Sequence, residues 1–221
     1  MKFTNAVSTT RIPFTKNLWM IASLTVFMVV WANSLIGTTD INNWLLENIL
    51  TFGFMIFLVA TYKKFQYSDL SYLLMAIYLC LHVYGSKYTY ADNTFGYWLQ
   101  DALDLSRNHY DRIVHFSFGF LLAYPMRETF LRWLGYPKKV AWLLPIEITL
   151  SVSGLYELIE WAVADIFFTE QGGAYLGTQG DIWDAQKDMF LATLGAALAT
   201  IIVSSIKRAL KIKGDEGKLK K

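Results

Sequence analysis

The sequence predicts an all-α integral membrane protein with six transmembrane helices. Hydrophobic residues make up 54% of the 221 residues, charged residues make up 17%, and the mean hydropathy is +0.31. A soluble domain of this length carries more charge and shorter apolar runs. Here the apolar runs are near twenty residues long, the length that a helix needs to cross about 30 Å of hydrocarbon. The weak net charge of +2 gives no indication of a nucleic-acid partner.

Six apolar runs define the predicted spans. Basic residues precede the first run, as in a signal peptide, but its apolar core is too long and no small-residue cleavage site follows, so we expect a retained helix. A single membrane domain over residues 1–221 is the simplest organisation. The spans are predicted at residues 17–36, 44–62, 70–86, 111–133, 140–168 and 184–206, and residues 207–221 are predicted to form a solvated, basic cytoplasmic tail.

The second and third runs are joined by a segment that contains Lys63 and Lys64. The third run holds the single cysteine, Cys80, whose apolar setting indicates a packing role and not a nucleophile. His82, late in the third run, is either a packed interior histidine or a contributor to a polar site.

The last three runs carry features that affect helix packing. Pro145 is expected to kink the fifth span, and Gly195 and Ala199 form a small-residue pair that allows a neighbouring helix to approach the sixth. The long segment before the fourth run is rich in aromatic residues typical of a membrane interface. These interfacial residues are Tyr97, Trp98 and Tyr110.

The orientation follows from the distribution of Lys and Arg. With the N-terminus inside and six crossings, both termini are cytoplasmic. Nine basic residues before the sixth span and the seven from Lys207 to Lys221 then lie inside, which makes sixteen of the twenty. This bias agrees with the positive-inside rule and predicts a bacterial inner-membrane protein.

Polar side chains occur in pairs at helical spacing in each of the last three spans. Residues three or four positions apart share one face of a helix. The fourth and sixth spans begin at the outer surface, and the pair in the fifth lies past its middle, so all three pairs fall in the outer half of the membrane. The pairs are Asp111 with His115, Glu157 with Glu160, and Asp184 with Asp188.

Several of these residues also have a purely structural interpretation. Asp181 is expected to cap the sixth span, and Asp111 is equally well explained by the positive end of its own helix dipole. His115 alone could be a satisfied interior histidine, and Asp184 an interfacial acid. The two glutamates are hardest to explain in this way, because ionisable groups at that depth usually face a bundle interior and serve function; the alternative is an interhelical hydrogen bond.

Several carboxylates around one imidazole would repel one another unless they are protonated or neutralised by a cation. Such a ligand set suits a divalent metal ion, whose identity stays open between Mg²⁺, Mn²⁺, Ca²⁺, Fe²⁺ and Zn²⁺. Arg112 and Lys187 could supply the positive charge instead. The predicted metal ligands are His115, Glu157, Asp184 and Asp188, and the predicted catalytic and orienting carboxylates are Glu157, Glu160 and Asp111.

The loop "FFTEQGGAYLGTQGD" lies between the fifth and sixth spans. Its glycines permit tight turns, so it could form a lid or an anion-binding nest, although a plain connector is at least as well supported. These glycines are Gly172, Gly173, Gly177 and Gly180.

Three segments resemble a known family. "HYDRIVHFSFGFLLAYPMRE", "LYELIEW" and "LGTQGDIWDAQKDMFLATLGA" are similar to the YjdF-like family of bacterial inner-membrane proteins, over most of the chain. A weaker resemblance is to VanZ-like membrane proteins, carried by Asp111, His115, the intramembrane Glu, and Asp184 with Asp188, although Thr193 stands near the position of their usual Asn. The resemblance implies membrane placement and no particular reaction.

Three functions fit these observations. The first is a metal-assisted hydrolase or transferase acting on an envelope or lipid substrate. The second is a cation- or proton-coupled transporter. It would need a polar path to the inner side, for which Glu147 is the leading residue, and the sequence lacks the inverted repeat common in transporters. The third is an assembly protein whose buried acids only pack. Membrane lipids are expected partners in each case, and the oligomeric state is left open.

Overall fold

The structure is a helical bundle. It is a computed structural model that describes residues 13–38, 40–167 and 176–219, and within these residues it contains seven α-helices and no strand. The α-helices are α1 (Leu18–Leu35), α2 (Ile41–Thr61), α3 (Asp69–Ser86), α4 (Thr94–Ala102), α5 (Tyr110–Glu128), α6 (Lys138–Phe167) and α8 (Asp184–Leu219). A short 3₁₀ turn, η1 (Phe14–Lys16), precedes α1, and a π-helical turn, η2 (Thr129–Trp133), extends α5.

A long helix lies at each of the six predicted spans. Four helices are long and apolar enough to cross a membrane: α1, α2, residues 138–166 of α6 and residues 184–209 of α8. The predicted spans 70–86 and 111–133 are present as α3 and as α5 with η2, but they carry more polar side chains. The reason is their position, because α3 and α5 lie inside the bundle and pack against each other. The helices therefore establish a multi-pass membrane protein with four candidate spans.

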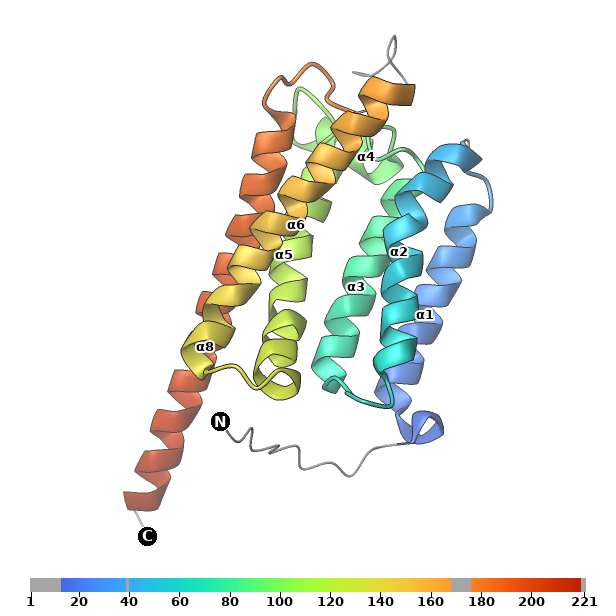
Figure 1. Cartoon of the computed structure of the whole chain (residues 1–221). Helices are drawn as coiled ribbons and strands as arrows, with labels where there is room; N and C mark the ends of the chain where they lie inside the picture. The colour runs from blue at the N-terminus through green and yellow to red at the C-terminus, as the bar shows by residue number, and fades with distance from the viewer. Residues whose placement is uncertain (1–12, 39, 168–175, 220–221) are drawn as a thin grey trace.

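The helices form two groups that meet at α3 and α5 (Figure 1). Helices α1, α2 and α3 form one group around a core that includes Phe27, Leu79 and Val83. Helices α5, α6 and α8 form the other. The start of α5, the end of α6, the start of α8 and the short helix α4 all lie at one end of the bundle, which we call the α4 end (Figure 1). The start of α1 and the late part of α8 lie at the opposite end.

Glycine allows α5 and α8 to cross in close contact. A Cβ atom on Gly119 of α5 would lie 1.8 Å from the carbonyl oxygen of Ala192 on α8, and a Cβ atom on Gly195 would lie 2.3 Å from that of Phe116. Ala196 and Ala199 are buried at the same interface. The predicted small-residue packing at Gly195 and Ala199 is thus confirmed, and it fixes how close the polar residues of the two helices come.

Two sequence expectations are corrected, and one helix was not predicted. Tyr110 is not interfacial: it is 1% exposed, and its hydroxyl donates to the carbonyl oxygen of Leu81 at 2.8 Å, because the chain before α5 folds into the bundle. That chain also forms α4, which the hydropathy pattern does not predict because the helix has only nine residues. The segment predicted as a separate basic tail from residue 207 continues α8 as far as Leu219. Helix α6 continues through Pro145, and the expected kink there stays a prediction.

Candidate functional site

An aspartate–histidine–aspartate cluster lies at the α4 end, between α5, α6 and α8. One ligand atom from each of Asp111, His115 and Asp188 lies within 4.8 Å of the others, close enough for one metal ion to reach all three. The imidazole Nε2 of His115 is 3.5 Å from Asp111 Oδ1 and 3.5 Å from Glu157 Oε1. Because Glu157 contacts His115, we include it in the cluster. Each of the three predicted pairs then contributes at least one side chain.

Helix geometry explains why these residues meet. Asp111 and His115 are four residues apart in the first turns of α5, so their side chains share one face. The glycine-mediated crossing places the first turns of α8, with Asp188, against that face. Helix α6 runs in the opposite direction, so Glu157, late in α6, reaches the same level.

Two buried carboxylate oxygens of the cluster have no hydrogen-bond partner among the described residues. Asp188 is 2% exposed, and its Oδ1 atom has no hydrogen-bond partner. The Oε1 atom of Glu157 is also buried and has no hydrogen-bond partner. Burying a carboxylate oxygen without a hydrogen bond or a cation is costly, so such atoms require a proton or a positive charge. Carboxylate oxygens and an imidazole nitrogen are suitable ligands for a hard or borderline divalent cation. The donor set therefore fits such an ion.

Asp184, one of the predicted metal ligands, has a different role in the structure. Its Oδ1 atom accepts from Arg107 at 2.6 Å and from Arg112 at 2.9 Å, and its Oδ2 atom accepts from Arg107 at 3.2 Å. Both Arg107 and Asp184 are almost fully buried. A carboxylate held by two guanidinium groups is already neutralised, so Asp184 organises the rim of the cluster and the metal-ligand prediction does not fit it. Arg112 supplies positive charge, as the sequence analysis allowed. It pairs with Asp184 and Asp181, which lie beside the cluster, and not with the cluster carboxylates.

Arg107 also holds the loop before α8 in place. Its guanidinium donates to the carbonyl oxygens of Thr178 at 2.8 Å and Gly177 at 3.3 Å. The neighbouring Asn108 exchanges two hydrogen bonds of 3.0 Å with the side chain of Gln179. Residues 177–181 thus form an ordered cover over the polar end of the bundle. The predicted lid glycines Gly172 and Gly173 lie outside the described residues.

Asp181 lies outside the helices and is strongly engaged. Hydrogen bonds from Lys187, from the backbone N–H of Trp183 and from Arg112 hold the pKa of its carboxyl group well below the usual range. The bond to the Trp183 N–H, at 3.1 Å, lies in the turn before α8, so Asp181 braces this turn and does not occupy the predicted N-cap position, which is that of Trp183.

Glu160, the other half of the predicted pair, belongs to a second polar group that includes Glu47 of α2. The hydroxyl of Tyr156 donates to Glu47 Oε2 at 3.0 Å, and Glu160, four residues after Tyr156, lies within hydrogen-bonding reach of the same hydroxyl. The ring of Tyr156 also stands edge-on to that of His115, with centroids 6.0 Å apart. The sequence analysis did not single out Glu47, although a lone carboxylate in the second apolar run was a usable signal.

His82 of α3 joins the same region. Its Nε2 atom lies 3.2 Å from the carbonyl oxygen of Glu47, and its Nδ1 atom lies 2.5 Å from the hydroxyl of Tyr90. Both ring nitrogens are therefore engaged, so His82 links α2, α3 and the loop before α4. It borders the candidate site without being a free ligand.

A cavity of about 560 Å³ leads from the cluster toward the opposite end of the bundle. Helices α2, α3, α5 and α6 line it, and most of its wall is apolar. Its polar residues gather at the α4 end and include Asp111, His115, His82 and Tyr156. Its other end is bordered by Phe54, Leu122 and Met126. A cavity with one polar and one apolar end suits a molecule with a polar head and an apolar chain.

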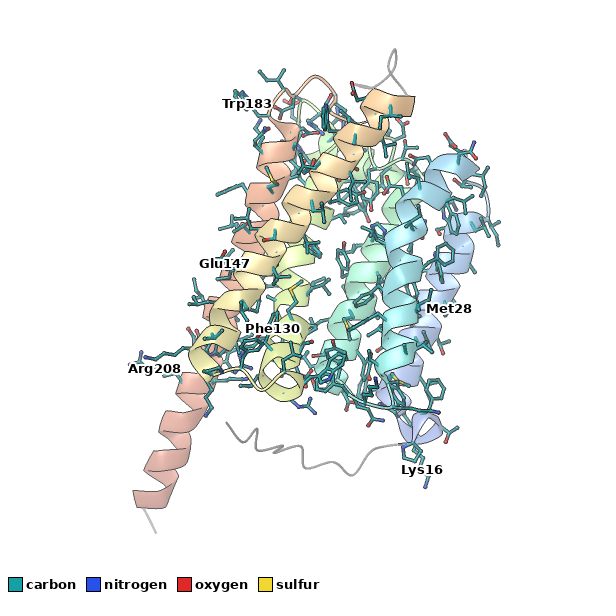
Figure 2. The ribbon with its side chains drawn as sticks, in the orientation of Figure 1. Lys16, Met28, Phe130, Glu147, Trp183 and Arg208 are labelled. Atoms are coloured by element: carbon teal, nitrogen blue, oxygen red, sulfur yellow. The ribbon has the colours of Figure 1, made fainter. Side chains whose placement is uncertain are left out.

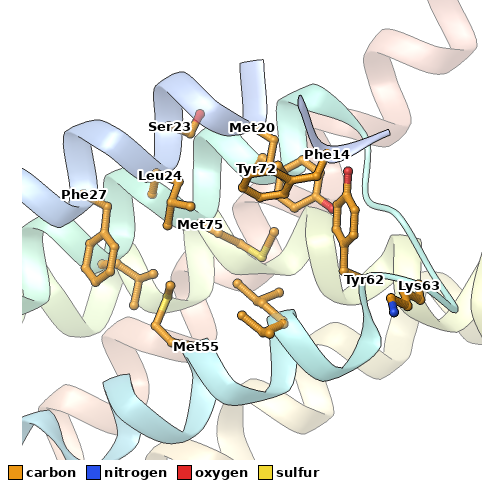
Figure 3. Close-up of a pocket in the computed structure, with 14 residues that line it drawn as sticks. Phe14, Met20, Ser23, Leu24, Phe27, Met55, Tyr62, Lys63, Tyr72 and Met75 are labelled. Atoms are coloured by element: carbon orange, nitrogen blue, oxygen red, sulfur yellow. The ribbon is translucent and has the colours of Figure 1, made fainter. Parts of the chain in front are cut away.

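A second, smaller cavity of about 210 Å³ lies between α1, α2 and α3 (Figure 3). Its wall contains Phe27, Met55 and Met75, and Lys63 stands at one end (Figure 3). Among the described residues it contains no acid or histidine, so the chemistry-bearing side chains belong to the larger cavity.

Comparison with known proteins assigns the chain to a family. The family described as "Predicted membrane protein (DUF2238)" matches residues 19–209. The chain belongs to this family. It is also 38% identical over 169 residues to "Inner membrane protein YjdF" of Escherichia coli (strain K12), which covers 76% of this chain and 79% of YjdF. No solved structure matches the chain.

These matches confirm the YjdF-like resemblance and the location. The chain is a multi-pass protein of the bacterial inner membrane, as its apolar helices also indicate. The weaker resemblance to VanZ-like proteins is not shown by them, and the matched names specify no reaction, substrate or metal.

Proposed function

We propose that this protein is a membrane-embedded, metal-assisted hydrolase or transferase that acts on a lipid or lipid-linked envelope substrate. One observation carries the proposal: Asp111 and His115 line the polar end of the larger cavity, and directly beside them lie Glu157 and Asp188, each with a buried, unpartnered carboxylate oxygen. Such a coincidence suits a substrate whose apolar chain occupies the cavity and whose polar head lies at the cluster.

The proposal includes a topology of six crossings with both termini cytoplasmic. Helices α3 and α5 are flanked by the four candidate spans and extend over the same height of the bundle (Figure 1). We infer from the distribution of Lys and Arg that the end that holds Lys16 and Arg208 (Figure 2) faces the cytoplasm. The α4 end, with the cluster, then faces the outer side of the membrane.

Each cluster residue has a role that follows from its geometry. Asp111, His115 and Asp188 hold the cation, since their ligand atoms lie within 4.8 Å of one another. A bound divalent ion supplies Lewis-acid polarisation of a carbonyl or phosphoryl oxygen. Glu157, whose Oε1 atom has no hydrogen-bond partner in the described part of the chain and lies 3.5 Å from Nε2 of His115, acts as the general base or acid.

A lateral route lets the substrate reach the cluster from the lipid. Helices α2 and α6 both line the cavity but do not pack against each other along their length; the hydrogen bond from Tyr156 to Glu47 connects them. The side chains of Ile49, Leu50 and Val152 at this border are exposed and apolar, as is suitable for contact with lipid chains. We therefore place the entrance between α2 and α6.

Metal analysis of detergent-purified protein tests the proposal first. We expect near-stoichiometric divalent metal in the wild type and its loss in His115→Ala, with Asp101→Asn on the exposed end of α4 as a matched control. We further expect Glu157→Gln to retain the metal but to lose metal-dependent turnover in a screen of phosphate-ester and acyl-ester lipids. The proposal is refuted if gently purified wild type neither contains a divalent metal nor binds one on titration.

The structure offers less support for a transporter. Glu147, the residue from which an inner proton path would begin, lies on an exposed part of α6 and does not line the larger cavity. The wall of the larger cavity away from the cluster is apolar.

A further inference from the structure

Arg127 near the end of α5 is a buried cation that lacks an anionic partner. It is 8% exposed, and among the described residues neither a hydrogen bond nor an ion pair engages its guanidinium; its Nε atom is both buried and unpartnered. The guanidinium carbon lies 3.9 Å from the centre of the Trp142 ring on α6. A cation–π contact satisfies the face of the guanidinium, but its N–H donors at the edge still need acceptors.

A second cation converges on the same ring. Lys207 of α8 places its Nζ atom 5.6 Å from the centre of the Trp142 ring and 5.7 Å from that of Tyr124. Three helices therefore bring two positive groups to one aromatic surface, which we call the Arg127–Lys207 site. Two like charges held this close repel each other unless an anion lies between them.

The neighbouring acid is already committed elsewhere. Glu128 accepts from the backbone N–H of Ser68 at 3.1 Å and from the hydroxyl of Ser71 at 2.5 Å, and it pairs with Arg132. In this way it caps the start of α3 on the other side of α5. No other acid among the described residues forms an ion pair with Arg127 or Lys207, so the missing negative charge has to come from outside the chain.

We propose that the Arg127–Lys207 site binds the phosphate of an anionic phospholipid from the inner leaflet. The site lies at the end of the bundle opposite α4, at the level of Arg208 (Figure 2), where the positive-inside distribution places the cytoplasmic headgroups. A phosphate can accept several hydrogen bonds from a guanidinium edge while the lysine adds a point charge. Trp142 and Tyr124 are the aromatic residues expected at that depth.

This site is independent of the metal cluster, because the two lie at opposite ends of the bundle and share no residue. The lipid that it binds is a bound partner and not a substrate. The inference rests on the proposed orientation of the bundle but not on the enzyme proposal, whose failure would leave it intact.

Lipid-dependent thermal stability of the detergent-purified full chain is the test. The probes are phosphatidylglycerol, phosphatidylcholine and inorganic phosphate, each added to wild type, Arg127→Gln, Lys207→Gln and Arg208→Gln. Arg208 is the matched control, since it neighbours Lys207 but points away from the bundle (Figure 2). Lys207 is exposed, so its variant is expected to fold even if Arg127→Gln does not.

With phosphatidylglycerol at about 100 times its Kd, we expect the melting temperature of the wild type to rise by about 5–10 °C. Phosphatidylcholine and inorganic phosphate should give no comparable rise. Lys207→Gln and Arg127→Gln should lose at least half of the rise, and Arg208→Gln should keep it. Equal rises in Lys207→Gln and wild type, or an equal rise with inorganic phosphate alone, would overturn the proposal.

Discussion

Replacing Gly119 with alanine tests whether the α5–α8 crossing sets the geometry of the cluster. The added Cβ atom would lie 1.8 Å from the carbonyl oxygen of Ala192 and 2.7 Å from the backbone nitrogen of Ala196. Both are backbone atoms, which cannot rotate out of the way. To reach an ordinary contact of 3.4 Å, the two helices have to separate locally by about 1.6 Å.

The expected cost follows from this overlap. Overpacking a close contact costs about 1–3 kcal/mol, and the better helix propensity of alanine offsets roughly 1 kcal/mol of it. Because the clash is with backbone, we take the upper part of the range, which leaves a net loss of about 2 kcal/mol. For a chain of this length, that loss corresponds to a fall in melting temperature of about 4–8 °C.

The same separation should loosen the Asp111–His115–Asp188 cluster. Its ligand atoms lie within 4.8 Å of one another only because α5 and α8 touch. A metal site depends on ligand positions at the level of a few tenths of an ångström, so we expect Mn²⁺ affinity, measured by titration calorimetry, to fall at least about tenfold.

Gly53→Ala is the matched control for Gly119→Ala. Gly53 lies inside α2, and a Cβ atom there meets nothing within 4 Å. We expect its melting temperature to equal or exceed that of the wild type, by up to about 4 °C. If Gly119→Ala melts at the same temperature as Gly53→Ala, the close crossing of α5 and α8 is not what holds the cluster together.

Two further predictions concern the α4 end. Because the folded-state pKa of Asp181 is lowered by Lys187, its ionised form stabilises the protein above the unfolded pKa of about 3.9, and this contribution disappears as the pH falls. The melting temperature of Asp181→Asn should therefore lie below that of wild type at pH 7, and the difference should shrink below about pH 4; a difference that is constant with pH would contradict the assignment. Arg107→Gln leaves the buried Asp184 short of a partner, so the folded protein should lose about 3–5 kcal/mol of stability. Hydrogen exchange in residues 177–181, which Arg107 holds, should also become faster. The control variant Lys187→Gln should change the exchange there much less. Unchanged exchange in Arg107→Gln would show that the loop is held by other contacts.

Local sequence patterns were sufficient to predict the long helices, because each long helix depends on the chemistry of a single segment. A run of about twenty apolar residues and a change to charged residues locate a membrane helix without reference to its neighbours. Spacing of three or four residues likewise placed Asp111 with His115 on one face before any packing was known. Short amphipathic elements such as α4 do not produce that signal, since nine residues are too few.

Which of the acids face one another was decided by the tertiary structure alone. Asp184 and Asp188 are equivalent by spacing, yet Asp184 is taken by Arg107, 77 residues earlier in the sequence, while Asp188 faces His115. Glu47 became part of the site because α2 lies across the cavity from α6. By itself the sequence determined a helical, multi-pass inner-membrane protein with its polar residues in three helices. Partner choice, the cavity and the unpaired Arg127 depend on contacts between distant segments, and no local pattern encodes those.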